Sequence, residues 1–329
     1  MTPASTAPRA TRPIVIAHRG ACGYLPEHSF AAKAYAHAVG ADFLEQDVVL
    51  TRDDIPVVFH DLVLDEVTDV ARLFPKRCRA DGHFYVVDFA YAEVQALSLH
   101  DRVESTSGAA AWPHRFGERL PFRIHSLAEE LTLVRGLNRA TRRSTGVYTE
   151  VKSPAWHRDA GKDLAPLVLG VLGDFGYRSE ADGCWLQCFD AAELARIRTQ
   201  LGSRLKLVQL IGENAWNESS TDYDALRTPA GLAGIARIAQ GIGPWIPQVV
   251  RWPAAGAAPV ATRLVGDAHA AGLAVHPYTF RIDQLPEHAP DAEAAQRALF
   301  ELAEVDGLFT DFPDVTRAFL GAAGGRWAN

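Results

Sequence analysis

The chain has 329 residues, of which 48% are hydrophobic and 22% are charged, and its formal net charge is -7. A chain of this size can bury one large core, and a single α/β barrel reaches this length. The acidic balance disfavours a general nucleic-acid binder, whose surface would be basic. No apolar run approaches the ~20 residues that a membrane-spanning helix needs. We therefore expect a globular protein without a transmembrane segment.

Residues 14–60 contain three short apolar runs, rich in Val and Ile, of the kind that forms buried strands. Extended runs are predicted at residues 14–18, 42–49 and 55–60, and a helix at residues 29–39. The helix is expected to end at Gly40, because glycine commonly forms a helix C-cap.

Side chains capable of acid–base or metal chemistry follow or end these runs: His18, Arg19, Glu45, Asp47 and His60. The carboxyl ends of the strands in a parallel barrel meet at one rim, where catalytic groups are found. We therefore expect these five side chains to lie close together on that rim.

Residues 61–123 interrupt the alternation of strands and helices. They mix Arg, Pro, Gly and aromatic residues, and only residues 91–97 have a helical pattern. Long loops inside compact domains tend to be functional. We interpret the segment as an insertion that lies over the catalytic rim.

The alternation resumes after residue 123 and continues to residue 320. Predicted helices are residues 127–137, 161–174, 191–201, 231–239, 262–271, 292–302 and 315–320. Predicted strands are residues 146–151, 184–189, 205–210, 241–244, 273–276 and 307–310. About eight βα units predict a closed (β/α)₈ barrel. The expected organisation is a tail (residues 1–13) and a single barrel domain (14–329) with an insertion at about residues 61–123.

The ordered motifs near the start of the chain resemble the N-terminal signature of the glycerophosphodiester phosphodiesterases. The matching residues are His18-Arg19-Gly20, Pro26-Glu27-His28, Gly40-Ala41-Asp42, Glu45-x-Asp47, Thr51-x-Asp53 and His60-Asp61. The resemblance continues along nearly the whole chain and is closest to the bacterial periplasmic type with a long insertion. It implies a TIM barrel and metal-dependent hydrolysis of glycerophosphodiesters, such as glycerophosphocholine or glycerophosphoethanolamine, to sn-glycerol 3-phosphate and an alcohol.

Glu45 and Asp47 are two apart in an extended run, so their side chains point to the same side. Two buried carboxylates repel each other, and a hard divalent cation resolves this by taking oxygen ligands. The resemblance implies that Glu150 completes a site for one cation, Ca²⁺ or Mg²⁺. The alternative is a set of carboxylates inside the barrel that Arg19 and Lys152 neutralise.

A positioned histidine contributes roughly 10²–10⁴-fold to catalysis by moving protons near neutral pH. The resemblance assigns His18 and His60 as acid and base, whereas a hydrogen-bonded structural role is the alternative for each. Arg19 and Lys152 are the candidates for binding phosphate, because a guanidinium forks onto phosphate oxygens and an ammonium acts as a point charge.

Four further residues are candidates for the substrate site. Glu27 is expected to hold His18 or to contact a substrate hydroxyl, unless it only stabilises the start of a helix. His28, beside it, is a variant of the family pattern, which usually has a small polar residue there. By resemblance, Gln187, Phe189 and Tyr278 are expected to line the glycerol pocket, with ordinary packing as the alternative for Phe189.

Two rival functions remain open. One is a phospholipase with the same barrel, acting on lysophospholipid or sphingomyelin through an exposed apolar rim. The insertion offers candidates for such a rim: Phe84, Tyr85, Val86, Val87 and Phe89. The other rival is a non-catalytic binder of polyol phosphates, which the presence of both His18 and His60 disfavours.

The compartment is the last expectation. Residues 1–13 lack the apolar stretch of a signal peptide, so we expect a periplasmic or secreted protein if such a peptide was removed, and a cytoplasmic one otherwise. A bridge between Cys22 and Cys78 would pin the insertion to the rim and would suit an oxidising compartment. Buried free thiols are the favoured alternative. The oligomeric state stays open.

Overall fold

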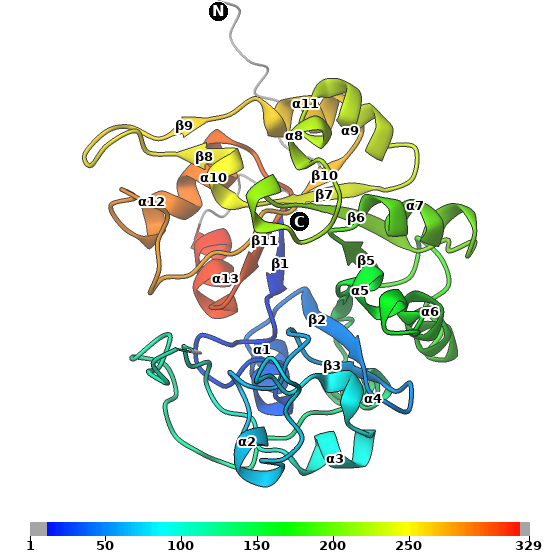
Figure 1. Ribbon diagram of the computed structural model, residues 1–329. Helices are drawn as coiled ribbons and strands as arrows, with labels where there is room; N and C mark the ends of the chain where they lie inside the picture. Colours follow the sequence, from blue (N-terminus) through cyan, green and yellow to red (C-terminus); the bar gives the residue numbers. More distant parts are fainter. Residues whose placement is uncertain (1–11, 105, 323–329) are drawn as a thin grey trace, which may run out of the picture.

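The computed structural model describes residues 12–104 and 106–322, so most of the expected tail lies outside the described residues. Eight parallel strands form the barrel, in the order β10-β7-β6-β5-β4-β2-β1-β11 (Figure 1). They are β1 (Ile14–Ala17), β2 (Phe43–Leu50), β4 (Gly146–Val151), β5 (Cys184–Cys188), β6 (Lys206–Ile211), β7 (Gly241–Pro244), β10 (Ala274–Val275) and β11 (Gly307–Thr310). The predicted (β/α)₈ barrel is confirmed.

The barrel closes between β10 and β11 through backbone hydrogen bonds that extend past the short β10. The Asp306 N–H donates to the Val275 carbonyl at 2.9 Å, and the Phe309 N–H donates to the Pro277 carbonyl at 3.0 Å. The Phe280 N–H then donates to the Phe309 carbonyl at 2.8 Å. The sheet therefore has almost no free edge, as closure requires.

One layer of large apolar side chains fills the middle of the barrel: Ile16, Tyr148, Trp185, Val208 and Phe309. Tyr148 stacks on Trp185 with ring centroids 5.8 Å apart, and its ring meets Phe309 edge to face at 5.0 Å. This layer seals the barrel, because inward-facing side chains of a small barrel fill it completely. Inward-facing residues that lie beyond this layer, towards the carboxyl ends of the strands, therefore form the floor of an open site.

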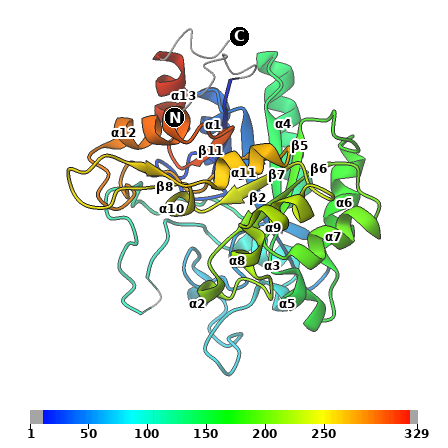
Figure 2. The same ribbon diagram turned by 90° about the horizontal axis from the view of Figure 1, so that it is seen from above.

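Helices surround the strands and bury their apolar faces against them in one large cluster. They are α1 (Phe30–Ala38), α4 (Leu127–Thr141), α5 (Pro154–Asp159), α6 (Leu164–Asp174), α7 (Ala191–Thr199), α8 (Tyr223–Leu226), α9 (Pro229–Ile235), α10 (Ile246–Val249), α11 (Leu264–Ala270), α12 (Ala292–Arg297), the π-helical turn η3 (Ala298–Leu302) and α13 (Pro313–Ala322). Figure 2 shows α5 and α8 at one end of the strands and α4 and α13 reaching the other end. Among the described residues, no helix is both long enough and apolar enough to cross a membrane.

Three local expectations differ from the structure. The run at residues 55–60 forms β3 (Pro56–Val58), which pairs antiparallel with β2 and stays outside the barrel. A tight turn, closed by the Thr51 N–H donating to the Ile55 carbonyl, sends the chain straight back. The helix predicted at residues 161–174 is α6, which begins at Leu164. The helix α5 before it and the hairpin of β8 (Val250–Arg251) and β9 (Val260–Ala261) were not predicted.

The segment at residues 61–123 contains three short helices: α2 (Val70–Leu73), the 3₁₀ turn η1 (Val86–Asp88) and α3 (Tyr91–Ala96). Its apolar side chains form a core of their own together with residues from β2, β3 and the chain just after β3. Phe84 is 6% exposed, Val87 is 7% exposed and Phe89 is fully buried. The exposed apolar rim expected for a lipid enzyme is therefore not formed by these side chains.

All four cysteines are free: Cys22, Cys184 and Cys188 are buried, and Cys78 is exposed. The hypothesis of a bridge between Cys22 and Cys78 is therefore wrong.

We expect four free thiols in the denatured, unreduced protein, measured by thiol titration. In the folded protein Cys78 alone should react quickly, because reagents reach exposed thiols first. Only two titratable thiols after denaturation would contradict the structure.

Candidate active site

The register of the strands gathers the acidic residues. Asp47 in β2 is level with Glu150 in β4, and Glu150 is level with Gln187 in β5. Glu45 lies two residues before Asp47 on the same inward face. The three acids are almost completely buried, at 1%, 1% and 5% exposure for Glu45, Asp47 and Glu150. The structure therefore brings the three predicted metal ligands together above the apolar layer.

Two cations accompany these acids. Lys152 Nζ is 2.9 Å from a Glu150 oxygen and 3.9 Å from Asp47 Oδ1, and Arg19 Nε is 3.3 Å from Asp47 Oδ2. Arg19 and Lys152 thus make the contacts that the alternative interpretation expected, in which they neutralise the carboxylates. They do not exclude a cation site, because both side chains also line the cavity, where a phosphate would compete for them.

The three carboxyl groups have very different affinities for protons. Burial and the charge of Asp47 raise the pKa of Glu45 well above its ordinary value, and burial is also the main cause that raises the pKa of Glu150. Burial would raise the pKa of Asp47 too, but the charges of His60 and Lys152 hold it well below its ordinary value. Without a further positive charge, the site therefore favours one ionised acid rather than three.

A hard divalent cation fits this donor set, because it takes carboxylate and amide oxygens and lets the carboxylates ionise. The Gln187 amide supports the fit. Its Nε2 is 3.5 Å from Glu45, whereas its Oε1 is buried without a hydrogen-bond partner among the described residues. A buried amide oxygen without a partner is costly, and a bound ion or substrate would satisfy it.

His28 has a place in this cluster that its sequence context did not reveal. It is 1% exposed, its Nε2 is 2.9 Å from Asp47 Oδ2, and it groups with Glu45 and Asp47 closely enough to share an ion. Burial and the charge of Lys33 lower the pKa of His28 to about 3, so the ring is neutral near pH 7. A neutral ring can donate to Asp47 and fix the direction of that carboxylate.

The loop after β1 explains the His-Arg-Gly order. Arg19 has a left-handed backbone (φ 54°), and its N–H donates to Glu45 Oε2 at 2.6 Å. Gly20 has φ +87°, and a Cβ there would lie 2.8 Å from the Ala32 carbonyl carbon at the start of α1. Only glycine fits this close approach, so the turn fixes the direction in which both His18 and Arg19 leave the strand.

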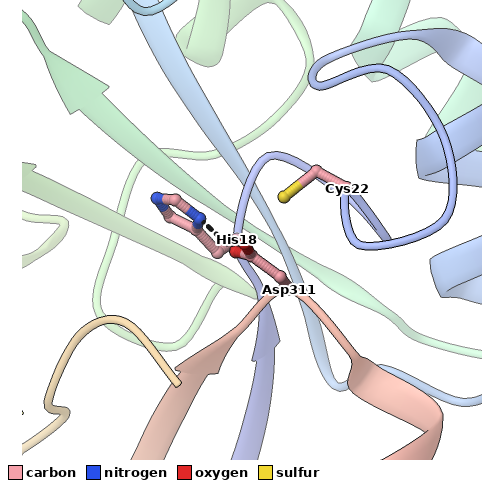
Figure 3. Close-up of side chains that lie close together, drawn as sticks. All are labelled: His18, Cys22 and Asp311. Atoms are coloured by element: carbon pink, nitrogen blue, oxygen red, sulfur yellow. Dashed lines mark hydrogen bonds and ion pairs between the residues drawn. The ribbon is translucent and has the colours of Figure 1, made fainter. Parts of the chain in front are cut away.

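His18 and Asp311 form a pair at the ends of neighbouring strands, β1 and β11. His18 Nδ1 is 2.7 Å from Asp311 Oδ1, and the Cys22 thiol lies beside them (Figure 3). Burial and the charge of Arg19 lower the pKa of His18 to about 4, so the ring is neutral near pH 7. The Asp311 carboxylate accepts a hydrogen bond from Nδ1–H, and the lone pair of the neutral ring is therefore on Nε2.

His60 has a matching arrangement just after β3. Its Nδ1 is hydrogen-bonded to Asp61, and its Nε2 is 3.2 Å from Lys152 Nζ. Burial and the charges of Arg19 and Lys152 lower the pKa of this histidine as well. Each histidine therefore has a carboxylate on Nδ1, which leaves Nε2 as the nitrogen for proton transfer.

One cavity of about 220 Å³ is lined by both histidines and the three acids. Other predicted residues on its wall are Arg19, Lys152, Gln187, Phe189 and Tyr278. Phe189 and Tyr278 meet edge to face at 5.8 Å, and the Tyr278 hydroxyl donates to the Ile211 carbonyl at 2.9 Å. The rim of β5, β6 and β10 therefore supplies an aromatic wall, and the Lys152 ammonium lies over its Phe189 ring at 5.6 Å.

Glu27 is the predicted site residue that does not line this cavity. It lies 3.0 Å from Arg19 and 2.7 Å from Arg102. The interpretation that Glu27 holds His18 is wrong, because Asp311 has that position. Glu27 instead fixes the Arg19 guanidinium, and the two arginines hold its carboxyl group ionised although burial works to raise its pKa.

Comparison with known sequences places this site in a family. The sequence profile of the Glycerophosphoryl diester phosphodiesterase family matches residues 18–315. The chain belongs to this family. A glycerophosphodiester phosphodiesterase of Haemophilus influenzae is 41% identical over 325 residues, covering 93% of this chain and 89% of the relative. One from Treponema pallidum is 37% identical over 333 residues, covering 95% and 93%.

Solved structures show the same fold. A protein of Silicibacter pomeroyi, named as a candidate glycerophosphoryl diester phosphodiesterase, superimposes with a TM-score of 0.74 at 24% identity, covering 97% of this chain and 96% of that one. A phosphodiesterase of Oleispira antarctica, in complex with the product sn-glycerol-3-phosphate, gives a TM-score of 0.63 at 18% identity and covers 94% and 97%.

Several site residues of this family member were not found by sequence reasoning. Asp311 comes directly after the strand predicted at residues 307–310, and this place was a usable signal. Arg102, Arg115 and Arg281 lie in irregular segments with no local pattern. The cavity wall also includes Trp216, Glu218 and Trp245, which follow β6 and β7. These residues reach the site through contacts with residues far away in the sequence, and such contacts cannot be predicted from the neighbouring residues in the chain.

We expect Asp311→Asn to change the tautomer of His18. Arg115 and Arg281 would bind the oxygen of the introduced amide, which would turn its NH₂ group towards Nδ1 and move the ring proton to Nε2. Imidazole ¹⁵N shifts measure the tautomer directly. Asp88→Asn, which removes a carboxylate from an Arg79 ion pair in the insertion, is the control and should leave His18 unchanged. An unchanged His18 in Asp311→Asn would refute this account.

Proposed function

We propose that this family member hydrolyses glycerophosphodiesters to sn-glycerol 3-phosphate and an alcohol. The observation that carries the proposal is the single cavity in which two histidines with fixed Nδ1 partners face three carboxylates and two cations. Two relatives that match nearly the whole chain are named glycerophosphodiester phosphodiesterases, which supports the same substrate class.

Substrate binding divides between the charged and the aromatic sides of the cavity. Arg19 and Lys152 bind the phosphate oxygens and stabilise the negative charge that builds on them in the transition state. Gln187, Phe189 and Tyr278 also line the cavity, where a small polyol finds an amide and an aromatic surface. This arrangement suits the glycerol moiety, whose carbon chain can pack on aromatic rings while its hydroxyls find polar partners.

His18 and His60 transfer the protons. One Nε2 takes a proton from the attacking hydroxyl, which belongs to water or to the glycerol 2-position, and the other returns a proton to the departing alkoxide. Both rings have lowered pKa values. A bound phosphodiester brings a negative charge beside them and raises their pKa values, so one ring can start as the acid. Asp311 and Asp61 stabilise each imidazolium as it forms.

Glu45, Asp47 and Glu150 would hold one divalent cation, Ca²⁺ or Mg²⁺, and the Gln187 amide nitrogen lies 3.5 Å from Glu45 beside them. When bound, the cation would polarise the phosphoryl group and add positive charge to the site. Arg19 and Lys152 would then no longer be needed to neutralise the carboxylates and would contact the phosphate.

The protein should release sn-glycerol 3-phosphate from glycerophosphocholine and glycerophosphoethanolamine, and chelation should abolish the activity. Addition of Ca²⁺ or Mg²⁺ should restore it, and the more effective ion identifies the natural one. A coupled assay of glycerol 3-phosphate measures both results. Glu45→Gln should weaken cation binding, measured by calorimetry, without lowering the melting temperature of the metal-free protein, because the raised pKa of Glu45 already favours a neutral side chain there and glutamine has the same size. Full activity in protein verified as metal-free would refute the cation site.

His18→Ala and His60→Ala should each lower kcat by roughly 10²–10⁴-fold while changing KM little, because each removes a proton-transfer group and leaves the phosphate contacts in place. Steady-state kinetics with glycerophosphocholine measures the effect. His288→Ala, which changes an exposed histidine outside the cavity, is the control. A variant of either cavity histidine that keeps nearly wild-type kcat would assign that histidine a structural role.

A further inference from the structure

Both cavity histidines are connected to the insertion in the same way. Each ring is held at Nδ1 by a carboxylate, and each carboxylate is held by an arginine of the insertion, residues 61–123. We propose that Arg115 and Arg102 are positioning residues that make this insertion part of the catalytic machinery. The proposal rests on the proposed function insofar as His18 and His60 are the groups that transfer protons.

Arg115 holds the Asp311 carboxylate from the side opposite His18. Its Nη2 is 2.8 Å from Asp311 Oδ2, while Oδ1 contacts His18 Nδ1 at 2.7 Å. The guanidinium is only 5% exposed; it also contacts Asp283 at 2.9 Å and donates to the Cys22 carbonyl at 3.2 Å. Such a chain of contacts, running from the insertion across the β1 loop to His18, leaves the Asp311 carboxylate little freedom to rotate.

Arg102 is paired with the partner of His60. Its Nη1 forms an ion pair with Asp61 Oδ2 at 2.7 Å and donates a hydrogen bond to Glu66 at 2.7 Å, while Asp61 Oδ1 contacts His60 Nδ1. Its Nη2 is 2.7 Å from Glu27, which in turn contacts Arg19. Arg102 therefore orients Asp61, the partner of His60. Through Glu27 it also orients the Arg19 guanidinium, which is proposed to bind phosphate.

The arginines have a chemical as well as a geometric effect. Burial alone would raise the pKa of both aspartates, and a protonated aspartate could donate to Nδ1 and force the wrong tautomer on the histidine. Arg281, the hydrogen bond with His18 and, to a smaller extent, Arg115 hold the pKa of Asp311 well below its ordinary value, and His60 and then Arg102 do the same for the pKa of Asp61. Because Arg281 gives Asp311 a second cation, the loss of Arg115 should weaken this pair without destroying it.

The test uses the full chain with Arg115→Met and Arg102→Met. Each should lower kcat about 10- to 100-fold, the usual effect of removing a partner that orients a functional group. KM should change little in Arg115→Met and should rise in Arg102→Met, because Arg102 also holds Arg19 through Glu27. The Nδ1–H fraction of His18 in the first variant, and of His60 in the second, should fall in imidazole ¹⁵N spectra. Arg→Lys at either position should give a kcat between those of the Met variant and the wild type. Lysine restores the positive charge but lacks the forked guanidinium that contacts a carboxylate at two points.

Arg79→Met is the matched control. Arg79 is also in the insertion, forms a two-contact ion pair with Asp88 at 2.7 and 2.8 Å, and lies over the Tyr85 ring, but it does not reach the cavity. It should cost stability without changing kcat or either tautomer. If Arg115→Met and Arg102→Met behave like this control, the proposal is wrong. If the wild-type protein hydrolyses no diester, the proposed function fails, and the ¹⁵N spectra still decide whether the arginines orient the histidines.

Discussion

The burial of three carboxylates side by side inside the barrel is the constraint on which the rest of the site depends. Glu45, Asp47 and Glu150 would repel one another if all three were ionised, and they have lost nearly all their water. Such a cluster persists only when positive charge or hydrogen-bond donors surround it. The backbone N–H of Arg19, the Lys152 ammonium and the neutral His28 ring all serve this purpose in the structure. The same requirement supports the proposal that the cluster holds a divalent cation.

The two cations that neutralise the cluster are also the natural ligands of a phosphate. Arg19 and Lys152 thus connect the acids on the floor of the cavity with the histidines on its walls. Lys152 contacts Glu150 at 2.9 Å and His60 at 3.2 Å. A change in the charge of Glu150 therefore affects the pKa of His60, and the reverse also holds. Electrostatic coupling over such short distances in a buried site is strong. Binding of cation and of substrate should therefore depend on each other.

The apolar layer beneath this cluster makes the arrangement possible. Tyr148 and Trp185 stack across β4 and β5 and fill the barrel below Glu150 and Gln187. Behind β2, the buried Lys33 pairs with Glu130 at 2.8 Å and bonds to the Glu45 carbonyl, which fixes the strand that carries two of the acids. Close packing of these side chains leaves the strands little room to move, so the positions of the acidic side chains are fixed.

The sequence by itself determined the barrel and the residues at the strand ends. Period-two alternation put Glu45 and Asp47 on one face, and the apolar runs ending at His18 and Glu150 marked one rim, because strand periodicity is a local property of the chain. Only the tertiary structure decided which groups meet. Asp311 reaches His18 across 293 residues, and Arg102 and Arg115 come from segments without periodicity. It also turned β3 out of the barrel and kept Cys22 and Cys78 unpaired. Such contacts depend on barrel closure and on the path of the insertion, which no local pattern of residues encodes.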